Sequence, residues 1–311
     1  MSKTAFLFPG QGSQSIGMMS AIAAETGIVE DTFDEASEVL AYDLWDIAQN
    51  GPVERLNSTE VTQPALLAAG VATWRAWKSI GGYDPDFMAG HSLGEYTALV
   101  AAGALEFTDA VPLVARRGRL MQAATPAGTG AMAAVLGLDD GVLIEVCESA
   151  AQGQVVSCAN FNSPGQVVIA GEKDAVDRAC GLATEAGARR AIPLSVSVPS
   201  HCALMLPAAG QLQEVLKSID LKAPAIPVLH NVSTATCDDA DAIREALVQQ
   251  LWQPVRWSET VQRLVDGGVK RFAECGPGKV LAGLNRRICR QSDTVALISA
   301  TAMKESLEDW S

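Results

Sequence analysis

The stretch FMAGHSLGEYTALV at positions 87–100 decides how the rest of the sequence is interpreted. A short apolar segment, Asp86–Ala89, suits a buried strand, and Leu93–Ala102 is a run of small and apolar residues that suits a helix. Ser92 stands between them, with glycine two positions before it and two positions after it. This is the spacing of a nucleophile elbow, in which a strained turn exposes a serine above the end of a strand. The alternative is an ordinary glycine-rich turn with an N-capping serine.

Strand-like and helix-like segments also alternate on both sides of this turn. Alternation of this kind predicts a mainly parallel sheet that helices cover on both faces. The expected strands are Thr4–Phe8, Val228–Val232 and Arg271–Glu274, and the expected helices are Thr62–Ile80, Thr108–Ala124, Asp239–Leu251 and Lys279–Arg290.

The middle of the chain has a different order, strand-helix-strand-strand-helix-strand, which is the ferredoxin-like pattern. Its expected strands are Ala131–Leu136, Val155–Phe161, Gln166–Ala170 and Arg189–Leu194, and its expected helices are Asp139–Ala151 and Glu172–Ala186. The predicted fold class is α/β, with a large α/β-hydrolase-like subdomain (1–125 and 197–311) and an inserted small ferredoxin-like subdomain (126–196). A cleft between two such units is the default ligand site.

Composition excludes several function classes. The 311 residues are 48% hydrophobic and 19% charged, with a formal net charge of −13, which argues against nucleic acid or an anionic membrane as a general partner. The seven cysteines form no Cys-x-x-Cys pair, so we expect reduced thiols in a cytoplasmic protein. The apolar run at the N-terminus is too short for a signal peptide, and nothing approaches the length of a membrane span.

A nucleophilic serine needs a base, and the sequence offers three histidines. His91 adjoins the serine, and neighbouring side chains on a tight turn diverge. His230 follows the apolar run PVL and is expected to pack in the sheet as a strand residue. His201, in SVSVPSH, is the preferred base, although it could also be a histidine without function at a helix start. No acidic residue lies near it, so a backbone carbonyl could orient its ring.

Two further stretches could bind an anionic substrate. The glycines of FPGQGSQ, which contains Gln11, allow backbone N–H groups to face a ligand. VARRGRLMQ places Arg116 and Arg117 side by side on a helix, and one of them pointing inward would clamp a carboxylate. The alternatives are a simple strand-to-helix turn and a solvated basic face.

Taken together and in order, several motifs resemble one family: FPGQGSQ, TQPAL, GHSLGEY, RRG, GAMAAVLGL, NFNSPGQVVIAG, SVSVPSH and GPGKVL. The sequence resembles the malonyl-CoA:acyl carrier protein transacylases of bacterial fatty-acid synthesis over essentially its whole length. GHSLGE alone is shared with other acyltransferases, whereas the complete set is specific. The resemblance implies ping-pong transfer of a malonyl group to the phosphopantetheine thiol of an acyl carrier protein.

The resemblance also implies a role for individual residues. Ser92 would carry the malonyl ester, His201 would be general base and acid, and Arg117 would bind the free malonyl carboxylate. The N–H groups of Gln11 and Leu93 would form the oxyanion hole, and the main-chain carbonyl of Gln250 would orient His201. The remaining residues implied to face the substrate are His91, Asn160, Asn162 and Ser200. Ser200 precedes the histidine, where related polyketide enzymes discriminate between extender units, so discrimination against a methyl branch stays open.

Partners and cofactors follow from the same resemblance. Carrier proteins are acidic, and an acidic chain needs a local basic patch to bind one; the candidates are Arg189, Arg190, Arg286, Arg287 and Arg290, unless these are ordinary surface charges. We expect a monomer and no metal or bound organic cofactor, because CoA and phosphopantetheine arrive as parts of the substrates.

Three alternatives remain at this stage. A serine hydrolase such as a thioesterase would share Ser92 and His201 but would not need Arg117. A malonyl-transfer subunit of malonate decarboxylase or of a polyketide system would differ only in its acceptor. A non-catalytic scaffold would not need the three residues intact.

Overall fold

A computed structural model describes residues 2–126, 128–194 and 198–310 of the chain. Its larger part is built around a sheet with strand order β7-β2-β1-β8-β9, and every neighbouring pair in that sheet is parallel. The strands are β1 (Lys3–Phe8), β2 (Phe87–Gly90), β7 (Val228–Leu229), β8 (Val269–Glu274) and β9 (Asp293–Ala296). The expected parallel α/β architecture is thereby confirmed.

Helices cover both faces of this sheet, and β1 shows why. Phe6 and Phe8 belong to a core that also includes residues of α5 and α6. Ala5 and Leu7 belong to a second core that includes residues of α12 and α13. A strand that is buried on both faces reads as a continuous apolar run. The helices of this part are α1 (Ser20–Ala23), α2 (Ile28–Leu40), α3 (Leu44–Asn50), α4 (Val53–Leu56), α5 (Thr59–Ser79), α6 (Leu93–Ala101), α7 (Phe107–Ala123), α10 (Leu206–Leu216), α11 (Ala240–Gln250), α12 (Trp257–Asp266), α13 (Val280–Ile288) and α14 (Ala300–Trp310), with a 3-10 turn at Ala203–Met205.

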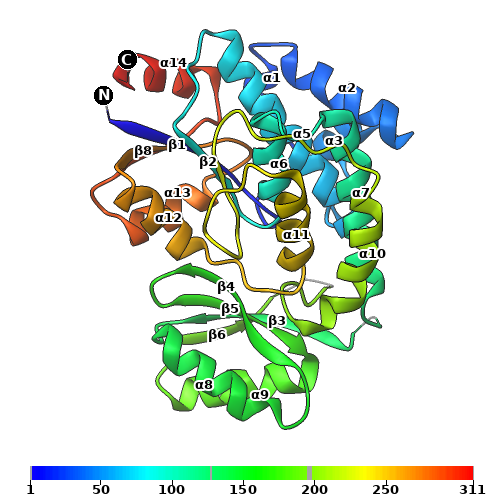
Figure 1. Cartoon of the computed structure of the whole chain (residues 1–311), viewed down its shortest axis with the longest axis vertical. Coiled ribbons are helices and arrows are strands. Elements are labelled where there is room, and N and C mark those ends of the chain that lie inside the picture. Colours follow the sequence, from blue (N-terminus) through cyan, green and yellow to red (C-terminus); the bar gives the residue numbers. More distant parts are fainter. Residues whose placement is uncertain (1, 127, 195–197, 311) are drawn as a thin grey trace.

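The smaller part lies at the bottom of Figure 1 and has the expected ferredoxin-like order. Its sheet has the antiparallel strand order β4-β5-β3-β6. Helices α8 and α9 pack against one face, and the other face, with Met132 and Val168, turns toward the large part. The elements are β3 (Gly130–Leu136), α8 (Asp140–Ala151), β4 (Val156–Ser163), β5 (Gln166–Glu172), α9 (Lys173–Glu185) and β6 (Arg190–Pro193).

Backbone hydrogen bonds join the two parts beside the cleft. The N–H of Phe161 donates to the carbonyl of Val255, and the N–H of Val255 donates to the carbonyl of Ala159, both over 2.9 Å. Strand β4 is therefore fixed to the segment that precedes α12. The junction expected near residue 196 falls on residues outside the described ranges, and the subdomain bounds of 126–196 stay a prediction.

The sequence-based prediction was incomplete in the large part. It did not include the helices between Ser20 and Leu56, nor α10, α12 and α14. The strand expected over Val228–Val232 ends at Leu229, because His230 and Asn231 turn away to bind Glu95. Within the described ranges, no helix combines the length and apolar character that crossing a bilayer requires.

Candidate active site

The turn between β2 and α6 has the strained geometry of a nucleophile elbow. Ser92 has φ 52° and ψ −109°, a conformation that side-chain-bearing residues rarely adopt. A Cβ on Gly90 would lie 1.9 Å from the backbone of Gly94, and a Cβ on Gly94 would lie 1.9 Å from the carbonyl oxygen of Phe8. Both positions therefore require glycine. The N–H of Ser92 donates to Asn231 Oδ1 over 2.7 Å and so holds the turn from behind.

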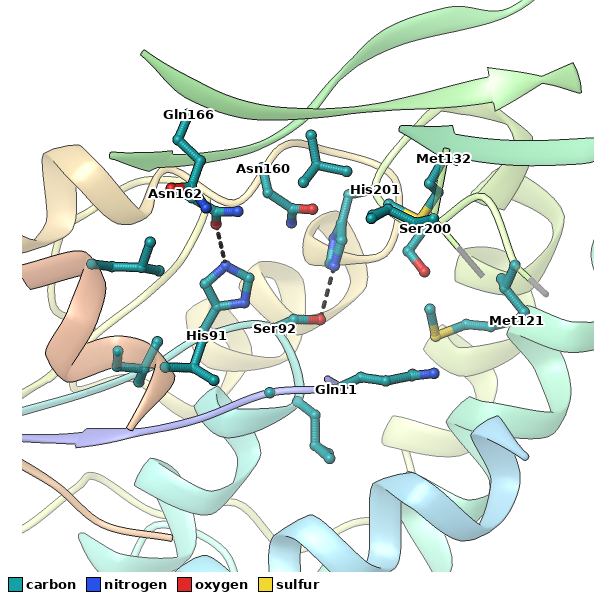
Figure 2. Close-up of a pocket in the computed structure, with 18 of the residues that line it drawn as sticks. Gln11, His91, Ser92, Met121, Met132, Asn160, Asn162, Gln166, Ser200 and His201 are labelled. Atoms are coloured by element: carbon teal, nitrogen blue, oxygen red, sulfur yellow. Dashed lines mark hydrogen bonds between the residues drawn. The ribbon is translucent and has the colours of Figure 1, made fainter. Parts of the chain in front are cut away.

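His201 is placed to act as the base for Ser92 (Figure 2). Its Nε2 lies 2.8 Å from Ser92 Oγ, and its Nδ1 lies 2.7 Å from the main-chain carbonyl oxygen of Gln250. A carbonyl can only accept, so Nδ1 carries the proton and Nε2 is left to accept from the hydroxyl. The orienting group is thus a neutral carbonyl in place of the acid of a typical triad.

Burial and charge keep the imidazole of His201 neutral. Desolvation, together with the positive charge of Arg117, lowers its pKa to about 3, against the opposing effect of the hydrogen bond to Gln250. The side chain is 3% exposed. His201 is therefore in the basic form throughout the neutral pH range, as a general base must be.

Arg117 is the inward-pointing arginine of helix α7, and it is 1% exposed. Its Nη1 donates to Gln63 Oε1 over 2.9 Å, and its Nη2 donates to Gln250 Oε1 over 2.9 Å and to Ser92 Oγ over 3.2 Å. Its guanidinium also lies over the ring of Tyr96, at 5.3 Å. A fixed, desolvated cation within reach of the serine oxygen suits a substrate with an anionic end. The neighbouring Arg116 is exposed.

These groups open into one cavity of about 250 Å³. Large-part residues form its floor and small-part residues its roof (Figure 2). Gln11 and Leu93 both line it, and Leu93 is the first residue of α6, whose N-terminal N–H groups have no partners within the helix. An oxyanion beside Ser92 would face this helix N-terminus. Other lining residues are Met121, Met132, Asn160, Gln166, Val168, Leu194, Val198, Ser200, Val280, Leu281 and Leu284.

His91 and Asn162 meet across the cavity. His91 Nε2 lies 2.8 Å from Asn162 Oδ1, so the imidazole of His91 points away from Ser92 and does not compete with His201 (Figure 2). The amide oxygen of Asn162 accepts from His91, and its NH2 group can still donate to a ligand. Desolvation lowers the pKa of His91, which keeps this contact one between neutral groups. Asn160 and Ser200 line the same space.

The basic residues suggested for partner docking line a second cavity, of about 730 Å³, beside the first. Gln166 lines both cavities, and the guanidinium of Arg287 donates to its side-chain oxygen. The arginines around this second cavity are all exposed, and none forms an ion pair with any residue that the structure describes. They are Arg189, Arg190, Arg286, Arg287 and Arg290, and we call them the arginine rim.

Reasoning from the sequence missed the second layer of this site. Gln63, Glu95, Asn231 and the side chain of Gln250 hold the residues that line the cavity. The expectation for His230 was wrong, since it lies beyond the end of β7 and binds Glu95. Only the position of Glu95 in GHSLGE, three residues after Ser92, could have drawn attention to it. Within the described ranges, no three or more acidic, histidine or cysteine side chains gather as they would around a metal ion.

Known proteins resemble this chain over nearly its whole length. Residues 5–309 match the acyl transferase domain family. The malonyl CoA-acyl carrier protein transacylase of Escherichia coli strain K12 is 56% identical over 308 residues, covering 99% of this chain and all of that protein. The solved transacylase of Coxiella burnetii superposes with a TM-score of 0.98 at 50% identity, covering 99% of this chain and 97% of that one. A malonyl-transacylase solved in complex with a type II PKS acyl-carrier protein also gives a TM-score of 0.98, at 54% identity, covering 99% and 100%.

Proposed function

Because the chain belongs to the acyl transferase domain family, we propose that it transfers a malonyl group from malonyl-CoA to the phosphopantetheine thiol of an acyl carrier protein. The observation that carries this proposal is the position of Ser92 Oγ, 2.8 Å from His201 Nε2 and 3.2 Å from Arg117 Nη2. Ser92 Oγ thus lies close both to a base and to a cation that can bind the anionic end of the acyl group. The relatives that match the full chain bear the name of this activity.

In the first half-reaction, Ser92 Oγ attacks the thioester carbonyl carbon while His201 Nε2 takes the hydroxyl proton. The tetrahedral oxyanion is stabilised by the N–H groups of Gln11 and Leu93. When the C–S bond breaks, the CoA thiolate leaves and takes the proton from His201. The products are free CoA and a malonyl ester on Ser92.

Arg117 selects the acyl group by pairing with its distal carboxylate. An acetyl group would leave the desolvated guanidinium without this partner, which disfavours acetyl transfer. Pairing would also reduce the positive field that lowers the pKa of His201. A malonyl substrate therefore strengthens the base that activates the serine, and an acetyl substrate does not.

In the second half-reaction, the phosphopantetheine thiol gives its proton to His201 and its sulfur attacks the ester carbonyl. The bond to Ser92 Oγ breaks, and the serine recovers the proton from His201.

The arginine rim beside the cavity mouth is the proposed docking surface for the acidic carrier. We further propose that the enzyme supplies the extender unit for fatty-acid synthesis and acts as a monomer in the cytoplasm.

The test is the mass of the intact protein after brief mixing with malonyl-CoA, followed by addition of holo carrier protein. We expect wild type to gain one malonyl group, mapped to the peptide that contains Ser92, and to lose it faster to the carrier than to water. Ser92→Ala should gain nothing, because it removes the hydroxyl that lies 2.8 Å from His201 Nε2. An adduct that decays equally with and without carrier would indicate a hydrolase, and wild type without an adduct would contradict the proposal.

A further inference from the structure

A buried carboxylate lies in the first turn of helix α6, three residues after the nucleophile. Glu95 is the third residue of α6 and is 0% exposed. Its Oε1 lies 2.7 Å from His230 Nδ1, and its Oε2 accepts from the N–H of Asn231 over 3.0 Å and from Gln250 Nε2 over 2.7 Å. A buried charge is tolerated only where its hydrogen bonds are satisfied. None of the chemical steps above uses Glu95, so the burial of its carboxylate needs another reason.

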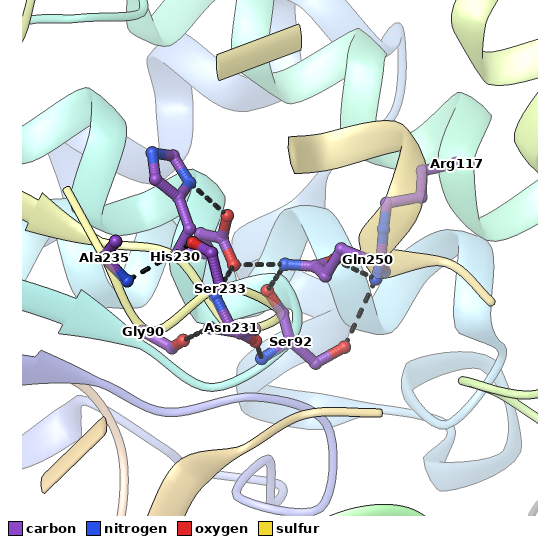
Figure 3. A network of polar contacts seen from close by, with 9 residues as sticks. Gly90, Ser92, Arg117, His230, Asn231, Ser233, Ala235 and Gln250 are labelled. Atoms are coloured by element: carbon purple, nitrogen blue, oxygen red, sulfur yellow. Dashed lines mark hydrogen bonds and ion pairs between the residues drawn. The ribbon is translucent and has the colours of Figure 1, made fainter. Parts of the chain in front are cut away.

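Two partners of Glu95, Gln250 and Asn231, are the residues that hold the catalytic groups (Figure 3). Gln250 binds Arg117 through its side-chain oxygen and orients His201 through its main-chain oxygen. Its Nε2 also donates to the carbonyl of Ser92 over 3.0 Å. Asn231 accepts from the N–H of Ser92 and donates to the carbonyl of Gly90 over 2.6 Å. The nucleophile, the base and the cation are therefore all one residue removed from Glu95.

The amide of Gln250 has two possible orientations, and Glu95 selects one of them. The NH2 group must face an acceptor, and the carboxylate is an acceptor only. With Nε2 toward Glu95, the oxygen of Gln250 faces Arg117, as its 2.9 Å contact requires. The reverse orientation would place two donors against each other at Arg117 and leave Glu95 facing an oxygen. The reach of the carboxylate thus determines where Arg117 finds its partner.

We propose that Glu95 is a positioning residue for the transfer reaction, which acts through the hydrogen bonds it accepts from Gln250 and Asn231. It keeps Ser92, His201 and Arg117 in one fixed arrangement. This inference rests on the proposed function. The role depends on how far the side chain of Glu95 extends its accepting oxygen, and not on its negative charge.

His230 makes that distinction testable. In Glu95→Gln the side-chain oxygen can still accept from Gln250 and Asn231, provided that the new NH2 group faces His230 Nδ1. His230 can then accept at Nδ1 and carry its proton on Nε2, which has no hydrogen-bond partner among the described residues. Glu95→Gln therefore keeps the reach and loses the charge. Glu95→Asp keeps the charge and draws the acceptor back by one methylene group.

The experiment compares the rate of malonyl-serine formation in these two variants with that in wild type. We expect Glu95→Asp to slow acylation about 10–100-fold, as misplaced catalytic groups do, and to lower the malonyl-to-acetyl ratio because Arg117 moves. Glu95→Gln should stay within about threefold of wild type, since a retained acceptor preserves that geometry. Thr97→Ser is the matched control, because it deletes one carbon from a buried side chain of the same helix without touching the catalytic groups.

Each other outcome overturns the inference. A wild-type rate in Glu95→Asp would mean that the reach of the acceptor positions nothing, and a slowed Glu95→Gln beside it would assign the effect to charge. Equal slowing in both variants would mean that an acceptor at the same reach is not sufficient for the role. A loss in Thr97→Ser equal to that in Glu95→Asp would reduce the effect to general destabilisation of α6. If wild type itself forms no adduct, the proposed function fails, and a crystal structure of Glu95→Asp then decides: unmoved Gln250 and Arg117 side chains would refute positioning.

Discussion

Two arginine regions stand side by side in this molecule, and they are built in opposite ways. Arg117 is buried, and each nitrogen at the end of its guanidinium has a fixed partner. The arginine rim is exposed and forms no ion pairs with the described residues. Gln166 lies between the two, because it lines both cavities. One region can therefore accept a single small carboxylate, whereas the other can adapt to a large acidic surface.

The difference shows where electrostatic energy is available for chemistry. A charge pair in a dry cavity is weakly screened and acts on the reacting atoms. Exposed charges are screened by salt and mainly accelerate encounter. We therefore expect losses in the buried region to affect acylation strongly and losses in the rim to affect only the carrier step.

The largest effect is expected for Arg117→Ala. Removing one partner of a buried charge pair costs about 2–5 kcal/mol, so acylation by malonyl-CoA should fall roughly 30-fold to several thousand-fold. Acylation by acetyl-CoA should fall less, because that substrate never used the guanidinium. The rate of adduct formation with each donor measures both. Arg116→Ala, on the exposed side of the same helix, is the matched control and should behave as wild type; equal losses in both variants would remove the distinction between buried and exposed arginines.

The sequence predicts the groups that line the cavity better than the groups behind it. Ser92 is visible because an elbow is a local pattern of strand, glycine, serine and helix. His201 could be chosen because only three histidines exist. Glu95 shows no such signal, since its partners lie 135 to 155 residues away in the chain. Contacts over such distances follow from the sheet order, which a local pattern does not contain.

The same limit explains what was missed in the fold. The ferredoxin-like order was predictable because each of its helices and strands alternates within a short span. The end of β7 was not, because tertiary contacts override local strand propensity there. His230 leaves the strand to reach Glu95.

A second effect concerns pH and the field that Arg117 exerts on His201. Desolvation and Arg117 lower the pKa of His201 to about 3, so kcat/KM for malonyl-CoA should hold its value from pH 7 to pH 5. A base with an ordinary pKa would be mostly protonated at pH 5 and would lose about thirtyfold. The same shift makes the native protein bind fewer protons than the unfolded chain between about pH 6.5 and 3, so stability should fall as the pH drops through that window.

Single-turnover acylation at each pH measures the first part, with circular dichroism as the control that the protein stays folded at pH 5. A decline of the acylation rate centred near pH 6.5 would show that the pKa of His201 is not lowered. Burial and the charge of Arg117 would then not act on the base as described.

The smallest effect is expected for Arg287→Glu in the rim. Exposed pairs contribute little individually, so the KM for the carrier protein should rise about three- to tenfold, and added salt should shrink the difference. The rate of malonyl-serine formation should not change, because among the described residues Arg287 is linked to the cavity through the side chain of Gln166 alone. Arg119→Glu makes the same charge reversal at an exposed site outside the rim and should leave both half-reactions at the wild-type level. Equal effects of Arg287→Glu on both half-reactions would mean that the rim also contributes to the reaction with malonyl-CoA. The two arginine regions would then not act in separate half-reactions.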